Sequence, residues 1–600
     1  MLDRSVLVYD GQCSFCGIWL RYWQALCGDS VEYVALQELG DRLPELDRET
    51  LSGAAHLVTI DGTPYHGAQA ILRLLAPTSW WPRLLLSLYE QVTSFAVVSD
   101  AIYAWIGRHR DFAYKATALL WGKEVRPQRY RLAEFVFLRL LGLVYSFAFL
   151  SLRHQITGLV GEHGIVPVNR VLQMLHGELG SRVYHLVPTL LWLSPTDQML
   201  TALCGTGIVF AVLLLVNVVP RFSTLVCWVA YLSLATVGQP FTSFQWDTLL
   251  LESGFLALFA GFPWQVWMFR LLVFRLMFES GVVKLTSGDS TWRSLRALRF
   301  HFETQPLPNP FAYVMHHAPV WFLDSLTGWV LVIELGSPFL LFAPRRLRHL
   351  GAWLLIGLQL GIAASGNYAF FNLLSLALLL WAFEDQAFEW LPAFAKQSAR
   401  KEARWSTTKW VRWPAAAVAV FIAFVGSAHV LDNLSPGTEP LIAAAENLIA
   451  PFDIVNHYGL FAVMTRDRPE IIFEGSNDGL AWQPYELPYK PSDVKRRLPI
   501  VAPLQPRLDW QLWFAAFGSP QQEPWTANLQ IRLLQGEPDV LKLFSGVPFA
   551  NPPKFVRAQR YDYRFTTKAE RDQTGDIWKR QLLGTYLPAM SLESLGDNGR

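Results

Sequence analysis

The sequence carries few charges for its length. Only 17% of its 600 residues are charged, against about 25% in a typical soluble domain, whereas 52% are hydrophobic. This mixture excludes a single soluble enzyme, and it excludes intrinsic disorder, which needs few apolar residues and a large net charge. The formal net charge of +2 offers no basic surface, so no nucleic acid is expected as a partner. Composition predicts a protein that crosses the lipid bilayer several times, with soluble parts at its ends.

Cysteine is scarce as well. The chain has 5 cysteines, and because none follows Cys227 the C-terminal part cannot form a disulfide. Cys204 and Cys227 lie in apolar runs and are interpreted as small packing residues. Cys13 and Cys16 form a C-x-x-C pair, but the second pair that a zinc ribbon requires is missing.

Several enzyme signatures do not occur. The sequence has no G-x-S-x-G, no H-E-x-x-H and no P-loop, so a lipase, a zinc protease or a nucleotide hydrolase would lack its usual parts. The apolar run at residues 6–9 is too short for a secretory signal peptide, and the acidic Asp10 follows it at once. We therefore expect no signal peptide, no bound metal and no cofactor.

Residues 1–128 have the composition of a soluble α/β domain. Strand-like runs rich in β-branched and aromatic residues occur at residues 5–9, 31–36, 56–60 and 63–65. Helical spacing follows the C-x-x-C pair, and Asp61-Gly62 predicts a two-residue hairpin turn. The order of strand, C-x-x-C at the mouth of a helix, strand, hairpin and helix predicts a thioredoxin-like fold.

Residues 129–434 contain apolar segments long enough to cross a bilayer as helices, which takes about 20 residues each. We place nine spans, near residues 133–153, 199–219, 222–238, 243–260, 264–283, 320–343, 349–365, 367–383 and 414–433. The 25 tryptophans fit this prediction, because membrane proteins concentrate tryptophan at the lipid–water interface. The segment is therefore expected to form a polytopic α-helical transmembrane bundle.

Basic residues indicate the orientation of this bundle. They cluster before the first span (Lys123, Arg126, Arg129, Arg131), after the sixth (Arg345, Arg346, Arg348) and before the ninth (Lys396, Arg400, Lys401, Arg404, Lys409, Arg412). A nine-span topology places all three clusters on one side. Since lysine and arginine are enriched in cytoplasmic loops, the N-terminus should be cytoplasmic and the C-terminal part exported.

Residues 435–600 are polar and rich in proline, with several strand-like runs. The turn-forming sequence at residues 475–479 lies between residues 470–474 and a return strand that begins at Trp482, which predicts a hairpin. We expect a β-rich, sandwich-like domain outside the cytoplasm.

The C-x-x-C pair is the clearest candidate for chemistry. A helix N-terminus stabilises a thiolate, so Cys13 is the predicted nucleophile, and Cys16, one turn on, is the predicted resolving thiol. Asp10 could take or give a proton beside them. Cys27 lies about three turns beyond Cys16 and is too far away to pair with it. The alternative is a chance pair of reduced structural cysteines.

Charges within membrane spans are costly, so each is a candidate functional residue. Asp247 and Glu252 lie about 140° apart around a helix and cannot face one partner, so we interpret each as bonding a neighbouring helix rather than relaying protons. Arg275 and Glu279 are four residues apart and can neutralise each other.

The loop at residues 286–319 follows Lys284 and lies outside the membrane in this topology. Its prolines at 306, 308 and 310 are expected to keep it extended, and the adjacent His316 and His317 point apart and make poor joint metal ligands. We interpret the loop as a shaped docking surface. The tentative partner-binding residues of the bundle and this loop are Lys284, His301, Glu303, Asn309, Asp247 and Glu252.

Two resemblances add to these expectations. The segment Tyr9-Asp10-Gly11-Gln12-Cys13-Ser14-Phe15-Cys16 resembles the signature of the DCC family of thiol-disulfide oxidoreductases, whose Asp, Cys and Cys fall on Asp10, Cys13 and Cys16. The resemblance covers roughly residues 5–115 and implies a thioredoxin-like fold and a cytoplasmic thiol reductant or oxidant as partner.

The remainder of the chain resembles the lipase maturation factor family. The carrying segments lie at residues 243–247, 288–292, 301–310, 458–461, 474–479, 506–510 and 551–554, in family order. In animals such proteins sit in the endoplasmic reticulum membrane and help dimeric lipases to reach an active fold. This chain departs from that pattern, because it has a redox domain in front and no cysteine in its exported parts, which indicates a bacterial inner-membrane protein.

Three hypotheses stay open. The first joins a cytoplasmic dithiol oxidoreductase to a folding factor for exported client proteins such as lipases. The second is a membrane enzyme acting on a lipid-soluble substrate or quinone, by analogy with the architecture of vitamin-K-dependent carboxylases, with Lys284 and His301 as the bases. The third is a non-catalytic scaffold in which Cys13 is inert.

Overall fold

The computed structural model describes residues 3–40, 53–402, 409–434 and 439–597. The chain divides into two compact units, one of residues 1–129 with 342–350 and the other of residues 130–341 with 351–600. All five cysteines and all of the candidate residues named above lie within the described parts.

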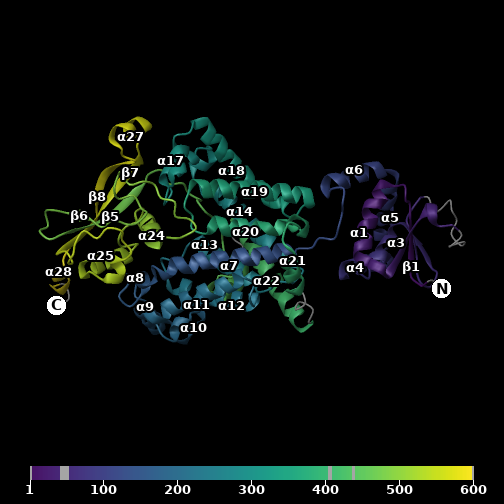
Figure 1. The fold of residues 1–600 in the computed structure, drawn as a ribbon, viewed down its shortest axis with the longest axis horizontal. Helices are drawn as coiled ribbons and strands as arrows, with labels where there is room; N and C mark the ends of the chain where they lie inside the picture. The colour runs from purple at the N-terminus through teal and green to yellow at the C-terminus, as the bar shows by residue number, and fades with distance from the viewer. Residues whose placement is uncertain (1–2, 41–52, 403–408, 435–438, 598–600) are drawn as a thin grey trace. The chain divides into compact units, whose positions relative to one another are not determined.

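The first unit contains a four-stranded sheet in the order β2-β1-β3-β4 (Figure 1). Its strands are β1 (Ser5–Tyr9), β2 (Val31–Ala35), β3 (His56–Val58) and β4 (Pro64–His66). β1 and β2 are parallel and need a crossover, which α1 (Ser14–Cys27) supplies, whereas β3 is antiparallel to both β1 and β4. This is the strand, helix, strand and hairpin order that the sequence predicted.

Helices complete the first unit. They are α3 (Gly67–Leu75), α4 (Trp80–Gln91), α5 (Thr93–Arg108) and α6 (Arg110–Leu120). The buried side chains of Leu7, Leu57, Ala70 and Leu74 pack between the central strands and α3. This apolar layer fixes the end of β1, and therefore the turn that carries the C-x-x-C pair.

Six described helices are long and apolar enough to cross a membrane. They are α7 (Arg131–Arg153), α11 (Asp197–Leu215), α12 (Pro220–Val237), α18 (Val320–Leu340), α19 (Arg345–Ser365) and α22 (Lys409–Leu434), the last over Arg412–Leu434. The expected spans at 243–260, 264–283 and 367–383 correspond to α13 (Gln245–Ala257), α14 (Gln265–Thr286) and α20 (Phe371–Leu379). The structure supports a polytopic membrane protein, and the count of nine spans stays a prediction.

These three helices differ from the six for physical reasons. α13 and α20 are short, with 13 and 9 residues. α14 has 22 residues, but it buries Arg270, Arg275, Glu279 and Lys284, which lower its hydropathy. A helix that is buried on nearly every side is surrounded by other helices, so its composition need not match that of lipid.

The loop at residues 286–319 is not extended throughout. It contains the short helices α15 (Ser290–Arg293), α16 (Leu298–Thr304) and α17 (Pro310–His316). Asn309 caps α17 by accepting the Ala312 backbone N–H, and Pro310 follows at the first helical position, where its missing N–H costs nothing. Pro310 therefore begins α17, and Pro306 and Pro308 lie in the segment between α16 and α17.

The C-terminal part forms one sheet rather than a sandwich. Its antiparallel order is β6-β5-β7-β8, from β5 (Pro469–Ser476), β6 (Gln483–Pro484), β7 (Phe555–Phe565) and β8 (Trp578–Met590). The hairpin predicted at residues 475–479 joins β5 to β6. Helices α24 (Arg507–Ala515) and α25 (Trp525–Gln535) lie against the sheet (Figure 1), α24 beside β5 and α25 beside β7, where a second sheet was expected.

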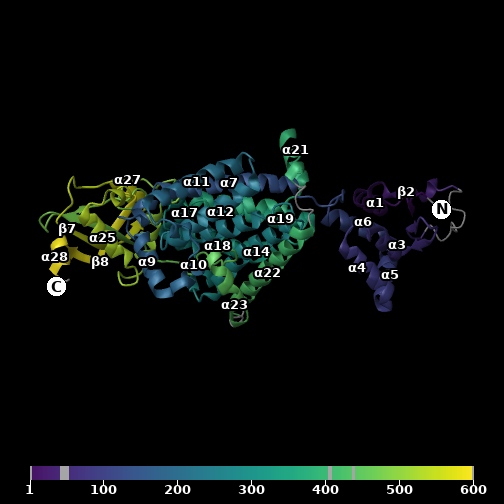
Figure 2. The same cartoon turned by 90° about the horizontal axis from the view of Figure 1, so that it is seen from below.

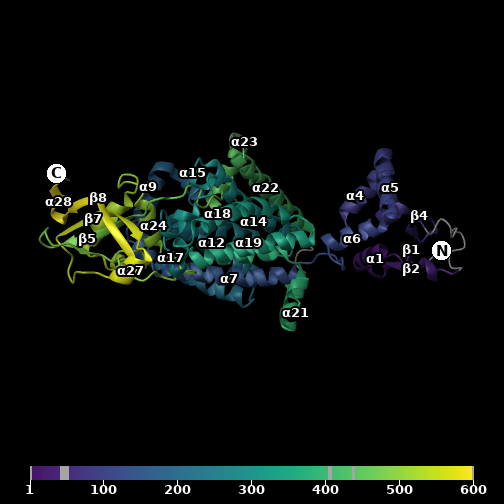
Figure 3. The same ribbon diagram turned by 90° about the horizontal axis from the view of Figure 1, so that it is seen from above.

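The remaining helices are connecting elements. They are α8 (Ile156–Val160), α9 (Val168–Leu179), α10 (Val183–Leu186), α21 (Ala393–Glu402), α23 (Glu439–Ile449), α26 (Pro538–Leu541), α27 (Lys568–Thr574) and α28 (Leu592–Asp597). Figures 2 and 3 both show α23 at the edge of the helical bundle, beside α22. One apolar core runs from α7 through the bundle to the C-terminal sheet, so the two regions pack as one body.

Candidate functional site

Cys13 is the N-cap residue of α1, and Cys16 lies in the first turn. The Cys16 backbone N–H donates a hydrogen bond to Cys13 Sγ at 3.3 Å. This donor and the positive end of the helix dipole stabilise negative charge on the Cys13 sulfur. Both thiols are partly exposed and neither is in a disulfide. The arrangement therefore provides an attacking thiol and a second thiol within reach to resolve a mixed disulfide.

Asp10 is held in place by three neighbours. Its carboxylate accepts the Gln12 backbone N–H at 3.0 Å and Gln37 Nε2 at 3.1 Å, and Arg110 Nη1 lies 2.9 Å from Oδ2. Burial alone would raise the pKa of Asp10, but these hydrogen bonds and the Arg110 charge hold it below its usual value. Asp10 is therefore ionised at neutral pH and shapes the turn, while Arg110 offsets its repulsion of a thiolate.

Cys16 differs from Cys13 in its surroundings. Burial, together with the contact with Cys13, raises the pKa of Cys16 to about 12, so Cys16 remains a thiol at neutral pH. Cys27 lies at the other end of α1, where its Sγ donates to the Leu74 carbonyl oxygen at 3.5 Å and burial raises its pKa. Cys27 thus lies at the opposite end of α1 from the C-x-x-C pair, as the spacing predicted.

Asp247 lies at the start of α13 and pairs with Arg507 of α24. Arg507 Nη2 is 2.9 Å from Asp247 Oδ1, and Nη1 is 3.0 Å from Oδ2, which is a bidentate contact. The Tyr231 hydroxyl donates to the same carboxylate. The side chains of Asp247 and Arg507 are at most 1% exposed, so the pair is removed from water. Asp247 therefore anchors the C-terminal part to the bundle.

Glu252 is part of a second buried network. Arg275 Nη1 lies 2.7 Å from Glu252 Oε1, and Arg275 Nε lies 3.4 Å from Glu279, as the four-residue spacing predicted. The Tyr458 hydroxyl donates to Glu252 at 2.8 Å, and the Tyr458 backbone N–H donates to Glu279 at 2.9 Å. Asn456 adds a backbone N–H to Glu252 at 3.0 Å. Both carboxylates thus bind the segment that enters the C-terminal sheet.

Glu303 and Asn309 also bind the protein's own chain. Glu303 accepts the Phe565 backbone N–H at 2.7 Å, and Asn309 Nδ2 donates to the Ala364 carbonyl oxygen at 2.9 Å. The buried guanidinium of Arg468 donates to the carbonyl oxygens of Glu303, Gln305 and Pro306. Glu303 thus binds the end of β7 and Asn309 binds the end of α19, while the interpretation of the loop as a shaped docking surface stays a prediction.

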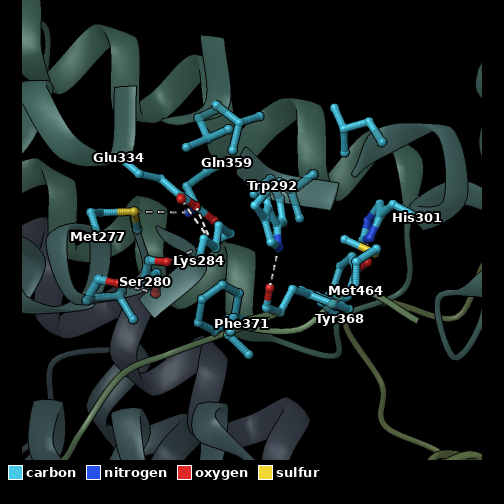
Figure 4. Close-up of a pocket in the computed structure, with 17 residues that line it drawn as sticks. Met277, Ser280, Lys284, Trp292, His301, Glu334, Gln359, Tyr368, Phe371 and Met464 are labelled. Atoms are coloured by element: carbon cyan, nitrogen blue, oxygen red, sulfur yellow. Dashed lines mark hydrogen bonds and ion pairs between the residues drawn. The ribbon is translucent and has the colours of Figure 1, made fainter. Parts of the chain in front are cut away.

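Lys284 and His301 line one pocket inside the bundle (Figure 4). Its volume is about 660 Å³, including the part open to solvent, and its walls come from α14, α16, α18, α19 and residues 460–464. Lys284 Nζ lies 2.9 Å from Glu334 of α18 and 5.3 Å from the centre of the Trp292 ring. In Figure 4, Trp292 lies between this ion pair and His301. Most of the other lining residues are apolar, so the pocket has a hydrophobic wall with a few polar groups.

His301 is oriented by a short chain of hydrogen bonds. Tyr368 Oη lies 3.1 Å from His301 Nε2 and donates to Gln305 Oε1 at 2.8 Å. The Tyr368 hydroxyl has one proton, which it donates to Gln305. His301 Nε2 must therefore carry a proton and donate it to Tyr368 Oη, which leaves the ring's lone pair on Nδ1. Burial, together with the nearby charge of Lys284, lowers the pKa of His301 to about 4. His301 is therefore a neutral base at physiological pH.

This shift predicts a pH-dependent stability. As pH falls from 6.5 towards about 4, His301 becomes protonated in the unfolded chain but stays neutral in the folded chain. The free energy of unfolding therefore decreases. His301→Gln keeps a polar side chain without this titration and should flatten the decline. The measurement is the unfolding temperature in detergent between pH 4 and 7, with the exposed His163→Gln as control. Equal slopes for His301→Gln and the parent would contradict the assignment.

Comparison with known proteins decides the family. Residues 132–390 match the lipase maturation factor transmembrane domain and residues 454–588 the lipase maturation factor C-terminal domain. The chain is 34% identical to lipase maturation factor 2 of Xenopus laevis over 77% of this chain and 83% of that protein. It is 35% identical to lipase maturation factor 1 of Bos taurus, over 78% and 92%, and 34% identical to the human factor 2, over 77% and 83%. The chain belongs to the lipase maturation factor family.

Ahead of its lipase maturation factor domains, residues 7–115 match a DCC1-like thiol-disulfide oxidoreductase. Both resemblances seen in the sequence are thus confirmed at the level of domains. No solved structure shows a significant match to the chain.

The lipase maturation factor segments recognised in the sequence meet in space. Trp246 and Trp510 lie with ring centres 4.7 Å apart, beside the Asp247–Arg507 pair, so the segments at 243–247 and 506–510 form one contact. Trp292 Nε1 donates to the Phe461 carbonyl oxygen at 3.0 Å and joins two further segments. Four of the seven segments therefore form contacts between the bundle and the part of the chain that follows it.

Sequence reasoning missed the partners of the candidate residues. Arg110, Glu334, Arg468 and Arg507 lie far along the chain from the groups that they bind, and local spacing carries no sign of such pairs. The one available signal was charge balance, because a buried carboxylate such as Asp247 needs a cation from elsewhere. Cys204 and Cys227 are buried thiols, as expected, and Cys227 Sγ donates to the Gly207 carbonyl oxygen at 3.8 Å.

Proposed function

We propose that this protein is a bacterial inner-membrane folding factor for exported proteins such as lipases, with a cytoplasmic dithiol oxidoreductase domain at its N-terminus. The family and the three matched domains support the two modules. The dithiol carries the redox part of the proposal, since Cys13 caps α1 and accepts the Cys16 N–H while Cys16 stays protonated. A cytoplasmic thiol reductant or oxidant would exchange electrons with it.

The maturation activity can be tested in a bacterial host that exports a lipase. We expect the specific activity of the lipase to rise when the full chain is co-expressed. Arg507→Met breaks the contact between bundle and sheet and should remove the gain, whereas Lys579→Met, on an exposed ion pair, should retain it. An unchanged specific activity with the parent chain would refute a maturation role for that client.

The proposed orientation makes its own prediction. Reporter fusions at the N-terminus should be active only in the cytoplasm, and fusions near residue 590 only outside it, because the three basic clusters share the cytoplasmic side. The dithiol and the C-terminal sheet would then face different compartments, so direct oxidation of exported clients is not part of the proposal. Reporters active on the same side of the membrane would overturn this orientation.

A second candidate function rests on the pocket. Lys284, Glu334, His301 and Tyr368 bring an ion pair and a neutral base into an otherwise apolar cavity between helices, which suits a lipid-soluble substrate or a quinone. His301 would act as the base, and Lys284 would hold a negative charge that develops on the ligand.

This candidate predicts a specific binding defect. A photoreactive quinone analogue should label the parent chain in detergent and label Tyr368→Ala or His301→Gln several-fold less. Arg299→Gln, at a half-exposed ion pair outside the pocket, is the matched control and should be labelled like the parent. Equal labelling of all four proteins would remove the pocket as a ligand site.

A further inference from the structure

Two histidines and a glutamate meet where the last candidate span ends. His429 lies near the C-terminal end of α22, Glu446 lies on α23, and His457 follows these helices in the segment that leads to β5. His429 Nε2 is 2.5 Å from Glu446 Oε1, and His457 Nε2 is 3.7 Å from the same oxygen. One ligand atom from each residue lies within 4.8 Å of the others. The three side chains thus converge from three separate elements.

We propose that His429, Glu446 and His457 bind one divalent transition-metal ion of the zinc class. Two ligand atoms of a tetrahedral zinc ion, each bound at roughly 2.1 Å, lie about 3.4 Å apart, and the observed separations fall on both sides of that value. Two imidazole nitrogens and one carboxylate oxygen are a ligand set that zinc favours, with a fourth position left for water. This departs from the expectation of no bound metal, which rested on the missing second C-x-x-C pair, the missing H-E-x-x-H motif and the poor geometry of His316 and His317.

The two histidine rings stack, with centres 3.7 Å apart and planes that differ by 18°. A histidine lone pair lies in the plane of its ring, so both rings can bind one ion only if the His457 ring turns out of the stack. The distance of 3.7 Å from His457 Nε2 to Glu446 is too long for a hydrogen bond, so that bond does not hold the ring in place. The His457 side chain is therefore the ligand that must rotate when an ion binds.

Burial and charge around the cluster fit the same proposal. His429 is 3% exposed and gives a fixed ligand, while the side chain of His457 is 55% exposed and provides an entry path and the freedom to turn towards the ion. Arg275 and Asp432 are the charged groups that interact with the His429 ring. Arg275 is already paired with Glu252 and Glu279, so its positive charge is offset and does not stand free beside the cluster.

The position of the cluster indicates what the ion would do. His457 is next to Tyr458 and Asn456, whose hydrogen bonds fasten the segment to Glu252 and Glu279. An ion held by His457 and His429 would tie this segment to α22 and α23 from the other side. We infer a structural metal site that fixes the path of the chain from the bundle into the C-terminal sheet.

The test uses the full chain in detergent with Cys13→Ser and Cys16→Ser, so that the dithiol binds no metal. After treatment with a chelator, this parent should bind one Zn²⁺ per chain and unfold at a higher temperature when zinc is added. Co²⁺ in the same protein should show the visible absorption of a tetrahedral site with nitrogen and oxygen ligands.

The matched variants decide the assignment. His457→Ala, at a half-exposed residue, and Glu446→Gln should each weaken zinc binding by at least ~10-fold and remove the Co²⁺ absorption, as ligand loss requires. His163→Ala, at an exposed histidine that lies 4.0 Å from Glu537, should bind like the parent. Absence of zinc binding in the parent, or equal binding in His457→Ala and His163→Ala, would overturn the proposal.

Discussion

A Cys13→Ser variant should lose thiol–disulfide exchange with oxidised glutathione by roughly 100-fold or more, because the attacking thiolate is gone. A Cys16→Ser variant should still attack, but it cannot resolve the product, so a chain carrying one glutathione should accumulate. The difference follows from the structure, in which the Cys16 N–H stabilises the Cys13 sulfur while Cys16 itself is held protonated. Intact-protein mass spectrometry and the rate of glutathione release measure the two effects.

Cys27→Ser is the control for this pair. Cys27 lies at the far end of α1 and bonds Leu74, so its replacement should leave the exchange rate within about twofold of the parent. Full exchange by Cys13→Ser would show that the dithiol is a structural pair, and the redox part of the proposed function would fall with it. The metal proposal would stand, since it depends on other residues.

Breaking the Asp247–Arg507 pair should have the largest effect on stability. Arg507→Met leaves Asp247 buried without its cation, which typically costs about 3–5 kcal/mol. The exposed pair broken by Lys579→Met is worth only about 0–1 kcal/mol. We expect a clear fall of the unfolding temperature in detergent, followed by tryptophan fluorescence, for the first variant and almost none for the second.

A double variant separates charge from packing. Asp247→Leu combined with Arg507→Met removes both charges, so most of the lost stability should return if an unpaired carboxylate is the cause. A double variant as unstable as Arg507→Met would show instead that side-chain packing at Trp246 and Trp510 accounts for the loss.

The local features of the fold were predictable from the sequence. In the first unit, patterns within short stretches of sequence predicted the strands at residues 5–9 and 31–36, the turn at Asp61-Gly62 and the C-x-x-C pair at the start of a helix. The hairpin at 475–479 follows from its turn residues in the same way. Each depends on contacts within about 30 residues, which is the range over which periodicity and turn chemistry carry information.

The features that sequence analysis did not predict depend on residues that are far apart in the sequence. A sandwich was expected because the C-terminal part is strand-rich, but α24 packs on β5 and α25 on β7 instead, and nothing in the strand sequences indicates which element covers them. The loop at residues 286–319 was expected to stay extended, yet it contains three short helices, and Arg468, more than 160 residues away, binds its carbonyl oxygens. Lys284 and His301 were singled out separately, and only the fold places them around one cavity.

The Asp247–Arg507 pair also constrains how the chain is made. Asp247 of α13 is synthesised before its cation, which lies 260 residues further on, and at 5–20 residues per second this is a delay of roughly 13–50 s. During that interval the carboxyl group of Asp247 has no guanidinium beside it. The helices can therefore close around Asp247 only once Arg507 has been made, or with that carboxyl group protonated or hydrated.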